Sequence, residues 1–579
     1  MTDTFQTDHE GLTMFKPNRS LMASVLALLG AGVLTACQPG TAPEQDTATP
    51  LPLVVEGDQQ SYAGHLQTLS SDAFEGRAPG TQGEELTLEY LTEQFDALGM
   101  APGYDSPDGP SYLQPVPMVE ITNQSRTALS LNHGDESWEF TYPEHMIIGS
   151  RRLGDQAHGV SDSEVVFVGY GVVAPEYDWN DYEGIDVEGK TVVILVNDPG
   201  FATEDPELFN GRAMTYYGRW TYKYEEAARQ GAAAAIIVHD TAPASYPWEV
   251  VINSWSSAQF ELASDSDAVV SALEGWITVD AARELFAKSE MDFDAMQQAA
   301  ASSDFEAVSL ETTMSAEVTN SIRRGISYNF IAKMEGQARP DEAVVYTAHW
   351  DHLGRTLQVP GSAGIYNGAI DNASGTAGLI EIARMYAEAG APDRTVLFVA
   401  VTLEEYGLLG SRYYANNPVI PTNQTVGAIN MDALSLVGPT EDVVVVGHGS
   451  SELEDILKRA VEVQDRVVVP EPTPEGGFYY RSDHFNFARV GVPALYAKGG
   501  IRHREFGEEY GIAWNEDYRD VRYHKQADEF DPEWDFRGVI EDLELLYVVG
   551  RHLAETEQWP EWYEGNEFKS IREADRAGQ

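Results

Sequence analysis

The sequence predicts an α/β protein in which helices cover a mostly parallel, mixed sheet, together with a smaller β-rich domain. From residue 329 onward, apolar segments alternate with amphipathic ones in the order strand, helix, strand. The apolar segments are continuous, as in parallel strands that are buried on both faces. Between residues 150 and 316 the pattern changes to short β-rich segments such as EVVFVGYGVV and KTVVILVND. This change of pattern predicts a separate inserted domain.

The composition is that of a folded and strongly acidic chain. It has 579 residues, of which 43% are hydrophobic, so it can form more than one domain with a large core. Its 93 acidic and 37 basic residues give a formal net charge of −56. Such a surface repels nucleic acid and anionic lipid, so neither is an expected partner. The single cysteine excludes an intramolecular disulfide.

The first 37 residues predict an export signal that ends at a lipid attachment site. Basic residues precede 14 uncharged residues, 21–34, a length that suits a signal peptide better than a bilayer span. The following LTACQPG resembles a bacterial lipobox with Cys37 as the lipidated residue. The alternative is a plain secretory signal with an incidental cysteine, and Met14 is an alternative start. We expect an exported protein, held by lipid alone on the periplasmic side of a bacterial membrane, with the outer membrane favoured.

The remaining segments are assigned in order along the chain. Residues 38–58 are rich in Pro, Thr, Gly and Ala and are expected to form a flexible tether. Residues 59–149 begin with two helices around a Gly/Pro turn, and Gly99 is expected to end the second helix. After the insert, residues 317–558 carry the alternating strands and helices, and residues 559–579 are expected to form a polar tail.

Imidazole and carboxylate side chains recur where the predicted strands of the C-terminal region end. VLFVAVTLEE, for example, runs from an apolar strand into two adjacent glutamates, although buried ionised groups are costly. In open α/β sheets the carboxyl ends of the strands converge on a ligand site. Capping explains one such residue but not a whole set, and the set suits Zn²⁺. Its members are His349, Asp351, Asp371, Glu404, Glu405, Asp432 and His524.

Several motifs resemble a known family in their order and spacing. HWDH, DNASG, EEYGLLGS, NMDA and YHKQAD are similar to motifs of the family-28 zinc metallopeptidases, which include aminopeptidases, glutamate carboxypeptidase and transferrin receptor. LSSDAFEGRAPGTQGEELTLEYL resembles the family's N-terminal segment, so the resemblance covers about residues 60–555. The insert, with GKTVVILVND and AARQGAAAAIIVHD, resembles a protease-associated domain. The resemblance implies a zinc-peptidase sandwich fold.

The resemblance also implies a role for each site residue. Two Zn²⁺ ions per chain would be held, one by His349 and Asp432, the other by Glu405 and His524, with Asp371 bridging them. Glu404 matches the general base, Asp351 the carboxylate that orients His349, and Tyr523 the tyrosine that stabilises the oxyanion. No role is expected for the insert in metal binding or proton transfer.

Other residues near these motifs are open to more than one interpretation. Ser482 and Asp483 either line the pocket for the substrate's amino terminus or cap a helix. His484 is left outside the metal set because five ligands already fill the pattern. The remaining histidines considered are interpreted as surface or loop residues: His239, His352 and His503.

The favoured function is that of a two-zinc aminopeptidase, which releases N-terminal residues from peptides. The alternative is a carboxypeptidase or dipeptidase of the glutamate carboxypeptidase type, which needs a cationic clamp; Arg481, Arg502 and Arg504 are its candidates. A glutaminyl cyclase would use one zinc, which the ligand set argues against. A non-catalytic receptor is disfavoured by the intact set of site residues.

Overall fold

The structure is a computed structural model that describes residues 49–154, 157–256, 258–265, 269–355 and 364–577. The predicted signal peptide, Cys37 and most of the predicted tether lie outside these residues. The chain from Pro50 onward forms one compact unit. In the described part of the chain, no helix is long and apolar enough to cross a membrane.

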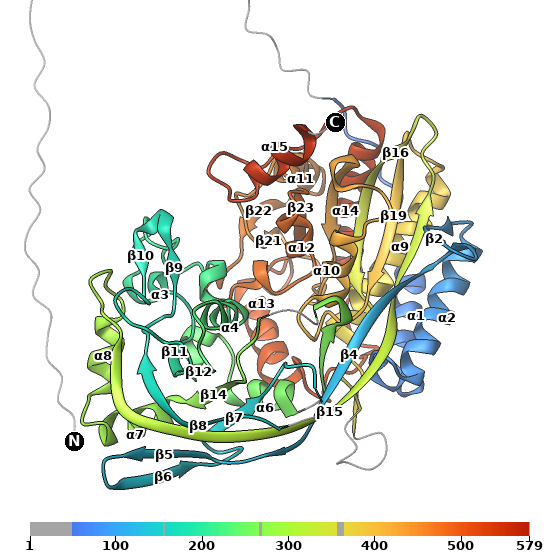
Figure 1. Ribbon diagram of the computed structural model, residues 1–579. Helices are drawn as coiled ribbons and strands as arrows, with labels where there is room; N and C mark the ends of the chain where they lie inside the picture. Colours follow the sequence, from blue (N-terminus) through green and yellow to red (C-terminus); the bar gives the residue numbers. More distant parts are fainter. Residues whose placement is uncertain (1–48, 155–156, 257, 266–268, 356–363, 578–579) are drawn as a thin grey trace, which may run out of the picture. The chain divides into compact units, whose positions relative to one another are not determined.

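A mixed, mostly parallel sheet lies at the centre of the C-terminal region (Figure 1). Four strands run parallel in the order β19, β16, β20, β23. On one side β15 pairs antiparallel with β19; on the other, β21 pairs antiparallel with β23 and β22 runs parallel to β21. The bounds are β15 Val308–Met334, β16 Arg339–His349, β19 Arg394–Val401, β20 Thr425–Asn430, β21 Asp442–Val445, β22 Val467–Pro470 and β23 Ala494–Gly499. The predicted fold class is confirmed.

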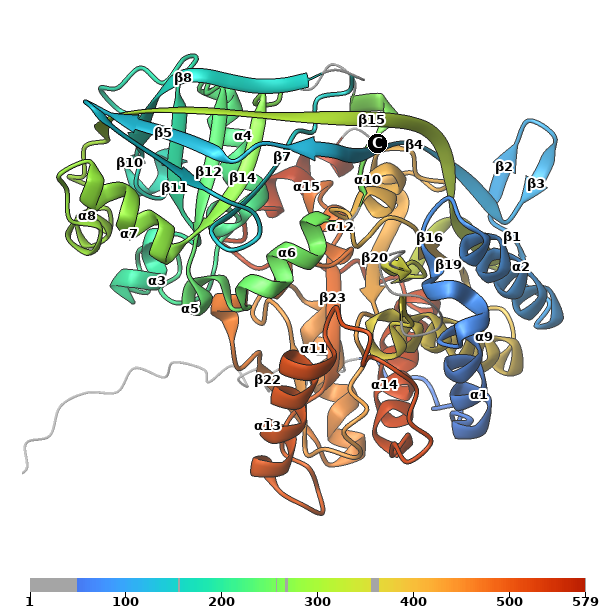
Figure 2. The same ribbon diagram turned by 90° about the horizontal axis from the view of Figure 1, so that it is seen from below.

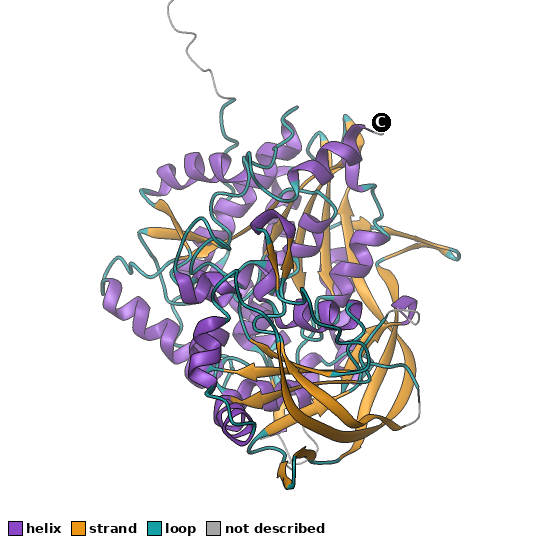
Figure 3. Ribbon diagram, turned by 60° about the vertical axis from the view of Figure 1, so that its left-hand side comes forward, coloured by secondary structure: helices purple, strands orange, loops and turns teal. Residues whose placement is uncertain are grey.

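Helices cover both faces of this sheet (Figure 3). Alternate residues of β16 belong to different hydrophobic clusters: Val344 and Tyr346 to one, Ala343 and Val345 to the other. On the first face lie α1 Gln59–Leu69, α2 Gln82–Ala97, α9 Ser374–Ala389, α11 Leu453–Val461 and α14 Arg537–Glu555. On the second lie α10 Leu409–Asn416 and α12 His484–Arg489.

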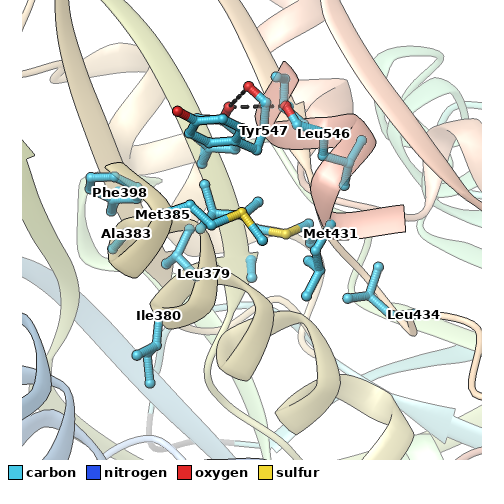
Figure 4. Close-up of a cluster of buried hydrophobic side chains, with 14 of the residues drawn as sticks. Leu379, Ile380, Ala383, Met385, Phe398, Met431, Leu434, Leu546 and Tyr547 are labelled. Atoms are coloured by element: carbon cyan, nitrogen blue, oxygen red, sulfur yellow. Dashed lines mark hydrogen bonds between the residues drawn. The ribbon is translucent and has the colours of Figure 1, made fainter. Parts of the chain in front are cut away.

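The core of the first face is built mainly from α9, α14 and the strands between them. In Figure 4, Leu379 and Met385 of α9 lie beside Met431 and Leu546. All four side chains are at most 1% exposed. Because this core holds α9 against the sheet, it also fixes the loop that precedes α9.

The inserted region forms a second sheet with its own hydrophobic clusters. Strands β8, β11, β12 and β14 run parallel, and β7 is antiparallel to β14. Helices α4 and α7 contact this sheet. The bounds are β7 Met146–Gly149, β8 Ala157–Phe167, β11 Thr191–Leu195, α4 Trp220–Arg229, β12 Ala234–His239, β14 Leu273–Thr278 and α7 Val279–Lys288. The larger cluster takes residues from Leu129 to Val318, and the predicted domain limits of 150 and 316 stay a prediction.

Two long strands connect the two sheets (Figure 2). β15 pairs with β8 near its start and with β19 near its end, while β4, Leu113–Arg126, runs antiparallel along it. A further strand of the insert, β13 Gln259–Leu262, pairs with β4. The ring of its Phe260 lies 4.5 Å from the ring of Tyr406. The insert is thereby packed against the residue that follows Glu405.

The C-terminal segment is more than the expected polar tail. It contains helix α15, Lys569–Ala577, and Trp562 and Phe568 are buried at 1% and 5% exposure. The Trp562 indole N–H donates to the carbonyl oxygen of Gly491. The few apolar residues among many charged ones thus suffice to pack this segment against the rest of the protein.

Candidate active site

Three parallel strands bring the predicted residues to one edge of the central sheet. His349 is the last residue of β16; Glu404 and Glu405 follow β19; and Asp432 follows β20. Because β16 pairs in parallel with both β19 and β20, these strand ends are neighbours. The expected convergence at the carboxyl ends of the strands is therefore present.

Two loops supply the remaining residues. Asp371 lies in the turn Ala369–Ala373 just before α9, and its peptide bond to Asn372 is cis. The backbone N–H groups of Ile370 and Asp371 both donate to the carboxylate of Asp528, at 3.0 Å each. His524 follows the turn Tyr518–Arg522 in a left-handed backbone conformation, with φ of 54°.

Asp371 lies between the two imidazoles. Its Oδ1 is 3.3 Å from Nε2 of His349, and its Oδ2 is 3.3 Å from Nε2 of His524. On the His349 side, Oδ1 of Asp432 is 3.4 Å from Nε2. On the His524 side, Oε2 of Glu405 is 3.0 Å from Nε2. The donor atoms thus form two adjacent groups that share one carboxylate.

The adjacent glutamates have different surroundings. Both oxygens of Glu405 are engaged, Oε2 by His524 and Oε1 by Nδ1 of His352 at 2.5 Å. The carboxylate of Glu404 has no hydrogen-bond partner among the described residues, and its nearest cation, Nε2 of His349, is 3.9 Å away. Burial raises the pKa of Glu404 well above its ordinary value. Burial also acts on Glu405, but His524 and His352 outweigh it and lower its pKa to about 2. The different surroundings thus move the pKa values of the two carboxyl groups apart.

Asp351 contacts His349 through its backbone carbonyl and not, as expected, through its carboxylate. Its backbone carbonyl lies 3.1 Å from Nδ1 of His349, whereas its carboxylate is 4.0 Å away. The carboxylate Oδ1 instead accepts from the backbone N–H of Glu404 at 3.1 Å. Burial raises the pKa of Asp351 to about 8. Asp351 therefore touches both His349 and the backbone of the glutamate pair.

Tyr523 is positioned by an arginine. Its hydroxyl accepts a hydrogen bond from Nη2 of Arg481 at 3.0 Å, which leaves its own proton free to donate. Its ring stacks on the imidazole of His524, with centroids 4.0 Å apart. Tyr523 and the metal-site carboxylates line the same cleft, whose volume is about 550 Å³.

The histidines interpreted as surface or loop residues are in fact buried. His239 and His503 are 3% exposed and His352 is 0% exposed. His239 lies in β12 and contacts the Tyr246 carbonyl oxygen at 3.0 Å, so its position reflects packing. His352 lies in a loop, but it is buried and contacts Glu405, so a surface position is wrong; its place within HWDH, three residues after His349, was the available signal.

Two further residues support the site: Ser482, which was expected either to line the pocket or to cap a helix, and Arg77, which was not predicted to take part. Ser482 does not cap α12; its hydroxyl donates to Oδ2 of Asp432 at 2.5 Å and accepts from Asn430. Arg77 is 0% exposed and donates to two backbone carbonyl oxygens. One belongs to Trp350, the residue after His349, and the other to Gly368, three residues before Asp371. An arginine among the small residues of EGRAPG was the only sequence signal.

The donor set fits a bound metal. Among the described residues, two groups have ligand atoms close enough to hold a metal ion: His349, Asp371 and Glu405, and His349, Glu404 and Asp432. These groups contain four carboxylates and one imidazole, and His524 adds a second imidazole beside Asp371 and Glu405. The carboxylates outnumber the imidazoles, so bound cations would stabilise the site electrostatically. Nitrogen and oxygen donors of this kind suit Zn²⁺.

Comparisons with known proteins show what one segment of the chain is similar to. Residues 329–548 match the model of peptidase family M28. A probable zinc metalloprotease from Leptosphaeria maculans is 35% identical over 104 residues, 18% of this chain and 23% of the relative. Leupeptin-inactivating enzyme 1 from Streptomyces exfoliatus is 29% identical over 210 residues, 35% of this chain and 43% of the relative. The chain thus spans less than half the length of these curated relatives.

A solved structure extends the likeness in fold beyond the matched region. The aminopeptidase from Aneurinibacillus sp. strain AM-1 superposes with a TM-score of 0.50 at 18% identity, covering 87% of this chain and 96% of that one. This likeness concerns the fold. The family match concerns residues 329–548, and the metal-suited donor set lies within this segment.

Proposed function

We propose that the protein is a two-zinc aminopeptidase that hydrolyses N-terminal residues from peptides. The observation that carries the proposal is the position of Asp371 between the imidazoles of His349 and His524, at 3.3 Å from each. One carboxylate shared between two histidine-containing groups is the arrangement that a pair of metal ions needs.

The geometry supports the division of ligands implied by the sequence motifs. His349 and Asp432 would hold one zinc, Glu405 and His524 the other, and Asp371 would contact both. When bound, zinc supplies Lewis acidity and lowers the pKa of water in its coordination sphere. Both oxygens of Glu405 contact imidazole nitrogens, which holds the carboxylate in place as the role of a metal ligand requires.

Glu404 and Tyr523 have the surroundings that their proposed roles require. The carboxylate of Glu404 lines the cleft without a hydrogen-bond partner among the described residues, so it can accept a proton there. The Tyr523 hydroxyl, held by Arg481, can donate to an oxyanion in the same cleft. Base and oxyanion donor thus belong to different elements that face one cavity.

The structural likeness to a protein named an aminopeptidase favours this activity. The carboxypeptidase or dipeptidase alternative needs a cationic clamp at the site. Of its three candidates, Arg502 pairs with Asp442 at 3.5 Å and Arg504 with Glu541 at 2.8 Å. Arg481 is the candidate that reaches Tyr523. A receptor without activity is disfavoured because the whole site is assembled.

Two proposals concern the rest of the chain. The insert, with its own parallel sheet and its contact through Phe260, is proposed to be a protease-associated domain that limits access to the cleft. The N-terminal lipobox pattern supports export and attachment to the membrane through Cys37 alone.

Release of chromophore from aminoacyl anilides tests the proposed activity. Free aminoacyl anilides and their N-blocked forms are compared in zinc-loaded and chelator-treated enzyme, with zinc per chain measured by elemental analysis. We expect hydrolysis of the free forms only, its loss on chelation, and its return with zinc or cobalt. Full activity in verified metal-free protein would rule the proposal out.

A further inference from the structure

Arg481, which donates to the Tyr523 hydroxyl, is held by contacts on several sides of its guanidinium group. Nη2 donates to that hydroxyl at 3.0 Å, and Nη1 donates to the carbonyl oxygen of Gly476 at 3.2 Å. The guanidinium also lies over two aromatic rings, 5.0 Å from the centroid of Phe478 and 5.3 Å from the centroid of Tyr246. An aromatic face attracts such a cation. The direction in which Arg481 donates to Tyr523 therefore depends on the residues that supply these rings and this carbonyl oxygen.

The ring of Tyr246 comes from the insert. Tyr246 lies between β12 and helix α6, Trp248–Ser256. Its carbonyl oxygen is 3.0 Å from Nε2 of His239, the last residue of β12, and the two rings are 5.8 Å apart. His239 is 3% exposed. The parallel sheet of the insert thus fixes the position of a ring that contacts Arg481.

The insert also contacts the turn Pro474–Gly476, whose last carbonyl oxygen binds Arg481. The backbone N–H of Met214 donates to the first carbonyl oxygen of this turn at 3.1 Å. Gly477 follows the turn with φ of 61°, and a Cβ at this position would lie 2.4 Å from the sulfur of Met214. Glycine permits both the left-handed conformation and the close approach. The insert therefore packs tightly against the turn that supplies the carbonyl oxygen.

The residue after Met214 is held in turn by a buried carboxylate. Asp198 lies just after β11 and is 0% exposed. Its Oδ2 accepts from the backbone N–H and the hydroxyl of Thr215, at 2.8 and 2.7 Å, and its Oδ1 accepts from the N–H of Gly200 at 3.1 Å. These hydrogen bonds compensate for the burial of the carboxylate. They fix the loop of Met214 to the end of a strand of the insert.

We propose that the insert positions the oxyanion donor of the active site: Tyr246 and Met214 hold Arg481, and Arg481 holds the hydroxyl of Tyr523. This inference rests on the proposed function, in which that hydroxyl donates to an oxyanion. It gives the insert a role in turnover, beyond the limitation of access to the cleft. A donor to a developing charge is effective when it is already oriented before the charge appears. The contacts of Tyr246 and Met214 provide this orientation without touching the reacting atoms.

Turnover of leucyl p-nitroanilide by the zinc-loaded enzyme tests the role of the Tyr246 ring. In Tyr246→Leu the aromatic face is lost, so kcat should fall by about 5–30-fold, the factor that corresponds to a desolvated cation–π contact. KM and zinc per chain should stay unchanged, because a donor to the oxyanion acts in the transition state. Tyr246→Phe keeps the ring and should keep kcat. If Tyr246→Leu unfolds, as Tm reports, Tyr246→Met takes its place, since methionine fills similar space without an aromatic face.

Trp138→Leu is the matched control. Trp138 is a half-buried aromatic residue packed against the larger cluster of the insert, and Nζ of Lys288 lies 5.2 Å from its ring centroid. It is not among the described residues that line the cleft, so its substitution should leave kcat unchanged. A double-mutant cycle locates the effect of Tyr246. In a Tyr523→Phe background, Tyr246→Leu should have no further effect on kcat, because the hydroxyl through which it acts is already absent.

An undiminished kcat in folded Tyr246→Leu would overturn the inference. An equal loss of kcat in the wild-type and Tyr523→Phe backgrounds would also contradict it, because Tyr246 would then act independently of the hydroxyl. A change in KM alone would show that Tyr246 contacts the substrate and does not position Arg481.

If the wild type hydrolyses no aminoacyl anilide, the proposed function fails, and a spectroscopic measurement decides the inference by itself. Zinc-loaded protein is labelled with 3-fluorotyrosine, and the fluorine resonance of Tyr523 is assigned from its absence in Tyr523→Phe. We expect this resonance to shift in Tyr246→Leu and to stay in place in Trp138→Leu. An unchanged resonance in Tyr246→Leu would mean that the insert does not determine the surroundings of the hydroxyl, and the inference would be wrong.

Discussion

Nδ1 of His352 lies 2.5 Å from Oε1 of Glu405, while the other oxygen of the same carboxylate faces His524 at 3.0 Å. Glu405 is thus oriented by a buried imidazole on the side away from the metal site. Groups behind a ligand fix its geometry and usually change metal affinity when removed. His352 is therefore a positioning residue for the ligand set, although it is not itself placed among the ligands.

Replacement of His352 by alanine should weaken zinc binding by about 10–100-fold, the range typical of such supporting groups. Zinc affinity can be measured by competition with a chelator of known strength. The matched control is His552→Ala, because His552 is buried in α14 and contacts Gln558. Unchanged zinc affinity in His352→Ala, with Tm preserved, would show that its contact with Glu405 has no such role.

Arg77 should be needed for the integrity of the site rather than for its chemistry. Its guanidinium donates to four backbone carbonyl oxygens, those of Leu69, Trp350, Asn367 and Gly368. Lysine cannot satisfy four acceptors spread in this way, and each unsatisfied buried group costs about 1–3 kcal/mol. We expect Arg77→Lys to lower the free energy of unfolding by at least about 2 kcal/mol and to reduce zinc content.

Denaturant unfolding and zinc analysis measure these two effects. Arg323→Lys is the control, since the Arg323 side chain is 56% exposed and forms a surface ion pair with Glu120. A loss of stability in Arg77→Lys no greater than in this control would contradict the prediction.

The sequence was sufficient for the parts of the site that follow a strand. His349, Glu404 and Asp432 each come directly after a continuous apolar segment, so the ends of three parallel strands could be inferred from pattern alone. Asp371 and His524 lie on loops; their residue types grouped them with the others, and the family resemblance supplied their individual ligand roles. The fold of the central domain was predictable for the same reason, because its strands are buried on both faces.

The residues that the insert contributes to the cleft could not be predicted from such strand patterns. Arg219 and Tyr246 reach the cleft because β15 and β4 join the two sheets through pairs such as Ile322 with Ile121. A pairing between strands that are so distant in sequence does not appear in the local hydrophobic periodicity of either strand. His352 was misjudged for a related reason, since its place within HWDH puts it near His349 but does not indicate that Glu405 lies beside it.

Lipid attachment should depend on Cys37. The only cysteine of the chain follows LTA at the end of the predicted signal, and lipobox processing would supply several acyl chains, as stable anchoring requires. We expect the wild type to acquire label from a radioactive fatty acid and to fractionate with membranes, and Cys37→Ser to do neither. Equal labelling of both proteins would show that the lipobox interpretation is wrong.

The paired glutamates should respond differently to the same substitution. Glu404→Gln keeps the size of the side chain but removes its ability to accept a proton. Because the carboxylate of Glu404 has no hydrogen-bond partner among the described residues, both zinc ions should stay bound. The value of kcat should fall by about 10²–10⁴-fold, as expected for the loss of a general base.

Glu405→Gln replaces an anionic oxygen that lies 3.0 Å from Nε2 of His524, and its neutral amide is a poorer ligand. Zinc content should therefore fall, and Tm with it, because metal binding contributes to stability. Zinc per chain and kcat are measured for both variants under the same conditions, so each serves as the other's control. If Glu404→Gln lost a zinc while Glu405→Gln kept two with near-normal turnover, the roles would be reversed. If neither substitution changed metal content or rate, the two carboxylates would be structural, and the proposed hydrolytic mechanism would have to be abandoned.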